Sequence, residues 1–373
     1  MRRRDFDFWI FITTILLLAL GVCMVYSASS YYASREFGNK EYFLVRQLIW
    51  ATIGIIAMLF VSRLDYRRLA QFSPFLLLAS GILLIMVLIP GIGSEINGSW
   101  RWFSFGFASF QPSEMAKLSI ILFFGYTLSK KPDKLQKFFK GLLPYLLIIG
   151  AVDLLLIKEP HYSGTILVTA VAVIILFCAG AKIWHFLLLA IPVIPAAAYL
   201  IYMEPYRMER VLTFLDPFSD PTDAGYQIIN SLYAIGSGGL FGKGIGQSVQ
   251  KNLYIPEPHT DFIFSILAEE LGFVGAVTVL LLFLVLIWRG IRIAMNAPDN
   301  LGSLLAIGIT SLIAVQVIVN IAVVTSTLPV TGMPLPFFTS GGSSLAFLLV
   351  GIGILLNISR SIGNQYRMKR EKV

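Results

Sequence analysis

Charge is scarce in this sequence. Lys, Arg, Asp and Glu make up 13% of its 373 residues, about half the share that soluble domains carry. Hydrophobic residues make up 57%, and the mean hydropathy is +0.78. So little charge over such a length excludes an ordinary soluble domain and indicates an integral membrane protein.

Cysteine and histidine are also scarce. The two cysteines, Cys23 and Cys178, fall inside apolar runs, so we expect core thiols and no disulfide framework. With only three histidines in the chain, His161 and His259 are too isolated to argue for a metal site. A small-residue cleavage site is missing after the first apolar run, which predicts a retained span and no signal peptide.

Apolar runs of membrane-spanning length recur from end to end. Each holds roughly 17–25 residues, enough to cross a hydrocarbon core about 30 Å thick. The runs predict helices over residues 8–27, 43–62, 73–90, 113–129, 142–157, 164–181, 185–203, 262–288, 303–327 and 344–362. The predicted fold class is all-α, a polytopic membrane protein of about ten transmembrane helices that form a single domain over residues 1–373.

Basic residues divide unevenly between alternate connections. Nineteen Lys and Arg residues fall on the side that holds the N-terminal segment and the basic tail 363–373, and eight fall on the opposite side. Because cytoplasmic loops carry the excess of Lys and Arg, both termini are predicted to be cytoplasmic. The net charge of +8 reflects this topology, and nothing further in the sequence supports nucleic-acid binding.

The longest connection, residues 204–261 between the seventh and eighth helices, is predicted to be extracellular. Loops of this length are uncommon unless they are functional. It contains "GYQIINSLYAIGSGGLFGKGIGQSVQ", where apolar residues at helical spacing precede a glycine-rich stretch. We expect a short interfacial helix and then a flexible loop. A phosphate-binding loop is disfavoured, because no strand precedes the glycines and no Gly-Lys-Ser/Thr follows.

Two oppositely charged residues open the fourth predicted span. Glu114 and Lys117 lie three apart, which puts them on one helix face within pairing distance. With Arg46, near the outer end of the second span, they would form a buried, net positive cluster suited to a phosphate or pyrophosphate group. An ion pair that only fixes helix packing is the alternative for Glu114 and Lys117.

Other polar features have structural interpretations. Asp153 has no obvious partner in the sequence, so a packing or cavity role is expected. Glu269 and Glu270 are adjacent on a helix and point in different directions, which favours roles in helix packing or a polar network. The segment "TGMPLPFFTSGGSS", residues 331–344, is an outer loop that forms either a tight reentrant turn or a wall of the active cavity.

The longest motifs together resemble one family. The strings "FQPSEMAK", "FLDPFSDPTDAGYQIINSLYAIGSGGLFGKGIGQ", "IPEPHTDFIFSILAEELGFVG" and "GMPLPFFTSGGSS" follow the order found in the SEDS family (shape, elongation, division and sporulation). The resemblance covers nearly the whole chain, and "GQSVQKNLYIPEPHTDFIF" looks closer to the FtsW and SpoVE branch than to RodA. One departure is "EPHYSGT", where many members have Gln-Pro-Asp before Gly-Thr, so we assign no chemistry to that loop.

The resemblance implies an activity and its residues. SEDS proteins are peptidoglycan glycosyltransferases that polymerise lipid II outside the bacterial cytoplasmic membrane, together with a class B penicillin-binding protein. By motif position, Asp261 corresponds to the catalytic acid, Glu114 and Lys117 to the polar pair, and Arg46 to the arginine of the second span. The remaining candidate substrate contacts are Arg207, Arg210, His259, Ser340 and Gly341. Lipid II, the growing glycan strand and membrane lipids are the other expected partners.

Such a polymerisation is a single inverting displacement, which needs a general base and positive charge on the leaving pyrophosphate. Asp261 is the candidate base, and Arg46 and Lys117, with a divalent cation such as Mg²⁺ or Mn²⁺, are candidates for holding the pyrophosphate. A lipid II flippase and a noncatalytic scaffold of a cell-wall synthase remain alternatives. In a purely structural role, Asp261 would cap the helix that follows it.

Overall fold

The structure is a computed structural model that describes residues 6–96, 98–106, 108–130, 135–203, 205–219, 221, 225–252, 255 and 258–370. A helix occupies each range in which the sequence predicts a membrane span. These helices are α1 (Phe8–Glu36), α2 (Tyr42–Val61), α4 (Ser73–Val87), α5 (Pro112–Lys130), α6 (Leu143–Lys158), α7 (Tyr162–Cys178), α8 (Ile183–Met203), α11 (Ile263–Asn296), α12 (Asn300–Val324) and α13 (Gly342–Arg370).

Six of these helices are long and apolar enough to cross a membrane by themselves. Among the described residues they are α1, α2, α6 with the π-helical turn before it (η2, Phe138–Leu142), α11, α12 and α13. Large apolar side chains cover their outer faces, and Ile56 of α2 and Leu284 of α11 are each 60% or more exposed. The chain is therefore a multi-pass membrane protein, while the count of about ten spans stays a prediction.

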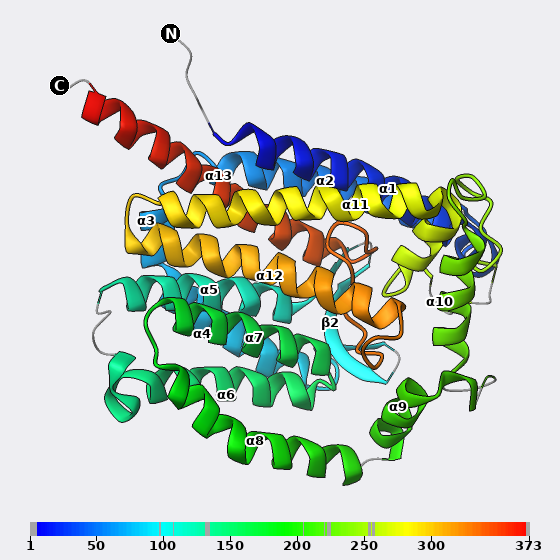
Figure 1. Ribbon diagram of the computed structural model, residues 1–373, viewed down its shortest axis with the longest axis horizontal. Helices are drawn as coiled ribbons and strands as arrows, with labels where there is room; N and C mark the ends of the chain where they lie inside the picture. The colour runs from blue at the N-terminus through cyan, green and yellow to red at the C-terminus, as the bar shows by residue number, and fades with distance from the viewer. Residues whose placement is uncertain are drawn as a thin grey trace.

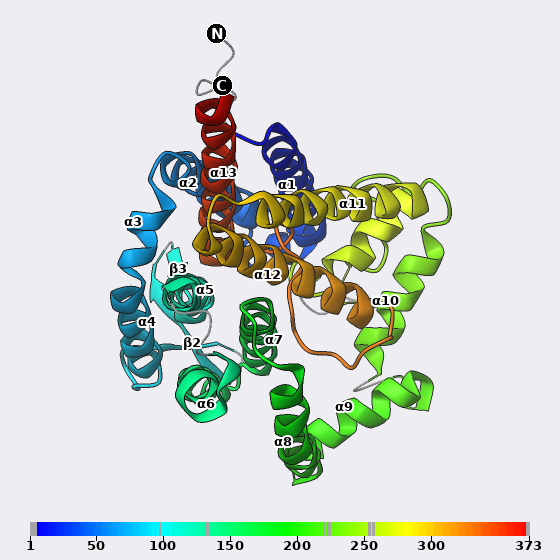
Figure 2. The ribbon, with the colours of Figure 1, turned by 60° about the vertical axis from the view of Figure 1, so that its left-hand side comes forward.

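Helix α5 explains how charge is accommodated among apolar helices. It packs against α4, α7 and α12 (Figure 2). Most of its side chains are buried. An enclosed helix does not present its side chains to lipid, so paired polar groups are tolerated there. Glu114 and Lys117 thus lie inside the bundle, not on its surface.

A small antiparallel sheet corrects the all-α expectation. Strands β1 (Ser94–Ile96), β2 (Ser99–Phe105) and β3 (Ala108–Phe110) pair in the order β1-β2-β3, between α4 and α5. The segment "SWRWFSF" of β2 is rich in aromatic residues, which favour strands, and "NG" between β1 and β2 is a typical tight-hairpin signal. Across β2 and β3, Phe103 and Phe110 stack with ring centroids 6.4 Å apart.

The two ends of the bundle differ in character. Helix α1 begins and α13 ends at the same end, beside α3 (Tyr66–Gln71), whereas α9 (Pro205–Leu215) and α10 (Tyr226–Ser237) lie at the other (Figure 1). A single-turn 3-10 helix, η3 (Pro217–Ser219), follows α9. At the first end Asp299 caps α12 through Gly302 N, and its other oxygen accepts from Tyr66 Oη at 2.9 Å and Arg67 Nε at 2.8 Å. These contacts join α3 to α12 at the end predicted to be cytoplasmic.

Candidate active site

Asp261 lies in the turn that leads into α11. Its side chain is half-buried, and its main-chain carbonyl accepts a hydrogen bond of 2.8 Å from Asn320 Nδ2 on α12. The same amide donates to Met333 O, also at 2.8 Å. A Cβ placed on Gly332 would lie 3.3 Å from Asp261 Oδ2, so the carboxylate abuts the loop between α12 and α13. The capping position of α11 is Phe262, which is one residue beyond Asp261.

Glu114, the acid of the Glu114–Lys117 pair, borders the same loop. Lys117 Nζ lies 2.7 Å from Glu114 Oε1, and the two side chains are 5% and 10% exposed. Glu114 lines a small cavity of about 20 Å³ together with Gln316 of α12, residues 334–337 and Thr339 of the loop, and Ser344 of α13. The loop from Gly332 to Thr339 therefore connects the aspartate to the cavity that Glu114 borders.

Ser340 and His259 tie this loop to the segment before α11. Ser340 N donates to His259 O at 3.4 Å, and Gly341 is the residue immediately before α13. The His259 ring is 4% exposed and packs against Phe43 and Tyr32, with centroid separations of 4.3 and 5.4 Å. Burial lowers the pKa of His259 to about 4, so the ring is neutral at pH 7. These contacts favour a role for His259 in holding the loop.

Arg46 lines a different cavity from Glu114. Its guanidinium lies 4.4 Å from the centroid of Tyr42, and Nη2 donates to Gly106 O at 3.2 Å. The groove beside it on α2 is lined mainly by apolar side chains, among them Ile49 and Trp50. The predicted cluster of Arg46 with the Glu114–Lys117 pair is thus not formed as one cavity. Arg207 and Arg210 belong to α9, and their side chains lie outside the described residues.

The loop between α6 and α7, to which the sequence assigns no chemistry, carries buried titratable groups. Glu159 follows α6 and is fully buried, and burial raises the pKa of its carboxyl to about 8, against the opposing charge of Arg101. Arg101 of β2 donates from Nε to Glu159 O at 3.0 Å and from Nη2 to Pro160 O.

His161 brings this loop close to the ion pair. Its pKa is lowered well below the usual value, first by burial and then by the charges of Lys117 and Arg101. The loop thus lies within electrostatic reach of Lys117. The string "EPHYSGT" contained the signal for these groups. His161 stands where many family members have the Asp of Gln-Pro-Asp, and Glu159 places an acid two residues earlier.

The sequence leaves open a divalent cation at the pyrophosphate. Within the part of the chain that the structure describes, no three His, Cys, Asp or Glu side chains come together as metal ligands. Mg²⁺ is, however, commonly held by one or two carboxylates together with the phosphates of a substrate. The divalent cation therefore stays a prediction.

Three comparisons with known proteins bear on this site. Residues 8–364 match the family model described as cell cycle protein, which unites FtsW, RodA and SpoVE. Stage V sporulation protein E of Bacillus subtilis strain 168 is 48% identical over 355 residues, covering 95% of this chain and 97% of that protein. A probable peptidoglycan glycosyltransferase FtsW of Geobacter sp. strain M18 is 43% identical over 360 residues, covering 96% and 98%.

Solved structures agree with the sequence comparisons. A chain of a peptidoglycan synthase complex, described for its structural coordination of polymerization and crosslinking, matches with a TM-score of 0.79 and 31% identity over 96% of this chain and 98% of that one. The rod shape determining protein RodA of Thermus thermophilus matches with a TM-score of 0.70 and 29% identity, covering 95% and 97%. The chain belongs to the FtsW, RodA and SpoVE family of cell cycle proteins, as the resemblance in its motifs predicted.

Proposed function

We propose that this protein is a peptidoglycan glycosyltransferase that polymerises lipid II at the outer face of the bacterial cytoplasmic membrane. Relatives of more than 40% identity over nearly the whole chain are named probable peptidoglycan glycosyltransferase FtsW. The observation that carries the proposal is the loop between α12 and α13. At Gly332 it meets the Asp261 carboxylate, and through residues 334–337 and Thr339 it lines the cavity that Glu114 borders.

In the proposed mechanism Asp261 accepts a proton. The acceptor sugar hydroxyl attacks the anomeric carbon of a second lipid-linked sugar and forms the new C–O bond as its proton passes to the Asp261 carboxylate. The bond from that carbon to the pyrophosphate breaks, and the polyprenyl pyrophosphate leaves with the electron pair. Attack from the face opposite the leaving group inverts the anomeric centre. A positioned general base contributes typically about 10²–10⁴-fold to such a rate.

Lys117 is the proposed source of positive charge for the leaving group. Its ammonium is almost fully buried, and charge in such surroundings interacts more strongly than in water. Glu114 fixes its position and offsets the cost of burying an unpaired cation. Arg46 contributes the positive charge of a largely apolar groove along α2, which suits an anionic headgroup that carries a lipid chain.

The proposed topology has about ten spans, cytoplasmic termini and an extracellular segment 204–261. The unequal division of Lys and Arg supports it. Further support comes from the common end at which α1 begins and α13 ends, opposite α9 and α10 (Figure 1). Asp261, at the beginning of α11, would then lie near the outer surface.

A class B penicillin-binding protein is the proposed partner. Support comes from the synthase complex that coordinates polymerization with crosslinking and contains a chain of the same fold. Co-purification with candidate transpeptidases, followed by comparison of glycan synthesis with and without each one, would test this partner.

Purified protein supplied with lipid II in detergent tests the function. Flipping has no meaning without a bilayer, so a flippase and a scaffold both yield no glycan. We expect glycan polymer from the wild-type chain, alone or with its transpeptidase partner. Unconsumed lipid II under both conditions would reject the glycosyltransferase.

A further inference from the structure

Helix α11 is broken near its outer end. Gly272 has φ 68° and ψ −169°, which divides the helix into an outer part, residues 263–271, and a longer inner part, residues 273–296. In an unbroken helix the N–H groups of Phe273 and Val274 donate to the carbonyls of Glu269 and Glu270. The break takes these groups out of helical register, and buried groups of this kind require other partners.

A glycine-rich loop, residues 238–244, supplies those partners. Phe273 N donates to Gly239 O at 2.9 Å and Val274 N to Leu240 O at 3.1 Å. In return Glu269 O accepts from Lys243 N and Glu270 O from Gly244 N, both at 3.0 Å. Four hydrogen bonds between the segments thus replace the two that the helix loses.

At two contacts between the glycine-rich loop and α11, only glycine fits. A Cβ at Gly242 would lie 2.2 Å from Glu270 O, and a Cβ at Gly272 would lie 2.3 Å from Gly242 N, distances that real Cβ atoms do not reach. The glycines expected to give a flexible loop instead permit main chain to pack against main chain.

The two adjacent carboxylates fasten the chain that follows the glycine loop. Glu269 Oε1 lies 2.7 Å from Lys243 Nζ, and its oxygens also accept from Val249 N and Gln250 N. These contacts place Glu269 in a polar network, one of the two roles that the sequence predicts for it.

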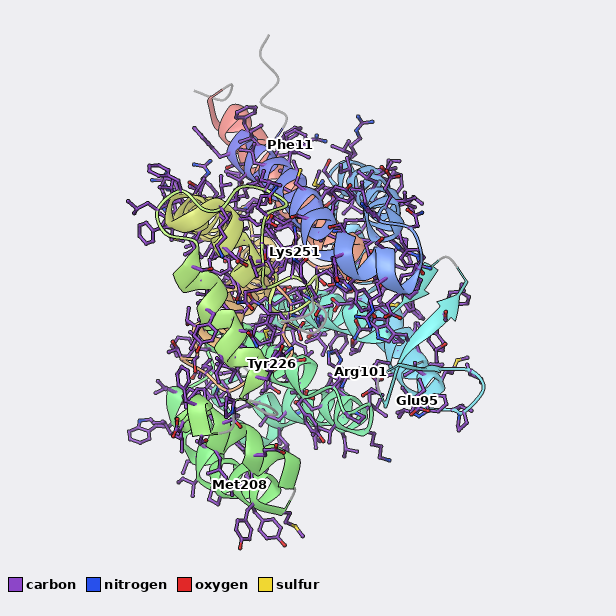
Figure 3. All side chains as sticks on the ribbon, turned by 90° about the vertical axis from the view of Figure 1, so that its right-hand side faces the viewer. Phe11, Glu95, Arg101, Met208, Tyr226 and Lys251 are labelled. Carbon is purple, nitrogen blue, oxygen red and sulfur yellow. The ribbon has the colours of Figure 1, made fainter. Side chains whose placement is uncertain are left out.

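Glu270 binds the same segment, through Ser248 N at 3.3 Å, and also reaches α1. Its Oε1 lies 2.9 Å from Lys251 Nζ, and both oxygens accept from Ser27 Oγ of α1 at 2.7 and 2.6 Å. Lys251 lies against α1 in Figure 3, and its side chain and that of Glu270 are 6% and 0% exposed. This buried pair joins α1, the segment after the glycine loop and the outer part of α11.

We infer that the glycine loop and the Glu270–Lys251 pair are positioning elements for the base of the reaction. This inference rests on the proposed function. Asp261 is two residues before the outer part of α11, so the direction of that part determines where the carboxylate lies. Without the loop, Phe273 and Val274 regain helical partners only if α11 straightens, which redirects residues 263–271. A displacement of about 1 Å at a reacting group can cost roughly 10²-fold in rate.

Two glycines of one segment provide a matched test. Gly242 and Gly246 both have positive φ, 78° and 85°, but a Cβ at Gly246 meets open space. Gly242→Ala and Gly246→Ala therefore impose similar backbone strain, but only the new Cβ of Gly242→Ala would also clash with the main chain of α11. Lipid II polymerisation gives kcat and KM, and hydrogen exchange of residues 263–274 reports whether the loop is docked.

We expect Gly242→Ala to lower kcat by about 10²-fold, to leave KM within about threefold, and to lose protection of the Phe273 and Val274 amides. Gly246→Ala should keep both kcat and protection. Wild-type kcat in Gly242→Ala, or equal losses in the two variants, would overturn the inference. If Gly242→Ala does not insert, Glu270→Gln combined with Lys251→Met removes the buried pair without an unpaired charge. A fall in kcat at unchanged KM is then expected, and wild-type kcat would overturn the inference.

Failure of the inference can be told from failure of the proposed function. A wild-type chain that makes no glycan, alone or with its partner, rejects the polymerase and with it the positioning of a base. The exchange data would still show whether the glycine loop holds the break in α11. An active wild type with an active, undocked Gly242→Ala variant rejects the positioning role alone.

Discussion

Removing the Lys117 ammonium separates its structural role from its role in the reaction. Lys117→Met leaves the Glu114 carboxylate, 10% exposed, without its partner at 2.7 Å. Breaking a buried ion pair in this way costs about 3–5 kcal/mol, because one charge stays buried and uncompensated. Glu114→Gln combined with Lys117→Met leaves no charge behind, and replacing both partners of a buried pair is often neutral for stability.

We expect the double variant to regain most of the stability that Lys117→Met loses and to remain inactive. Thermal unfolding in detergent measures the first quantity, and glycan synthesis from lipid II measures the second. The charge-swapped pair, Glu114→Lys with Lys117→Glu, is the matched control, because it keeps the attraction and moves the ammonium. Full activity of the double variant, or of the swapped pair, would refute the assignment of Lys117 to the pyrophosphate and leave the pair a packing element.

Two further predictions concern Glu159 and the topology. Burial raises the pKa of Glu159 from 4.5 to about 8 in the folded protein. The contribution of the protonated carboxyl to folding stability is therefore fully present below about pH 4.5 and is lost as the pH rises through 8. Glu159→Gln should therefore be close to the wild type in thermal unfolding at pH 5 and exceed it at pH 9, by on the order of 5 kcal/mol, and equal stability at pH 9 would contradict the burial argument. Single cysteines at Ser219 and Met368, in a chain without Cys23 and Cys178, should react with an impermeant thiol reagent in sealed cells only at position 219. Labelling of both positions would overturn the proposed sidedness.

The helices were predictable because a membrane leaves a strong signal. A helix occupies each range in which an apolar run predicts a span, and six of the described helices are long and apolar enough to cross a bilayer. The sheet before α5 was missed because its strands are short and lie among apolar runs, although "SWRWFSF" and the "NG" turn contained the signal. The break in α11 was also missed, because the string "EELGFVG" around Gly272 is compatible with an unbroken helix.

The site was predictable in part. Spacing alone gave the Glu114–Lys117 pair, and the motif gave Asp261 next to α11. Arg46 was grouped with the pair by its depth in the predicted span, but depth does not fix which side of a helix a residue occupies, and Arg46 lines another cavity. The surroundings of Glu159 depend on Arg101 reaching across from β2, a contact between distant segments that no local pattern records.

The substitution Asp261→Asn tests the central claim most directly. Asn keeps the size of the side chain and one acceptor oxygen, but it cannot act as a base. Rates of glycan synthesis should be measured with the purified variant at saturating lipid II, after its stability and partner binding are shown to match the wild type. We predict a loss of about 10²–10⁴-fold in kcat. Near-normal polymerisation by a stable Asn variant would contradict the assignment of Asp261 as the general base.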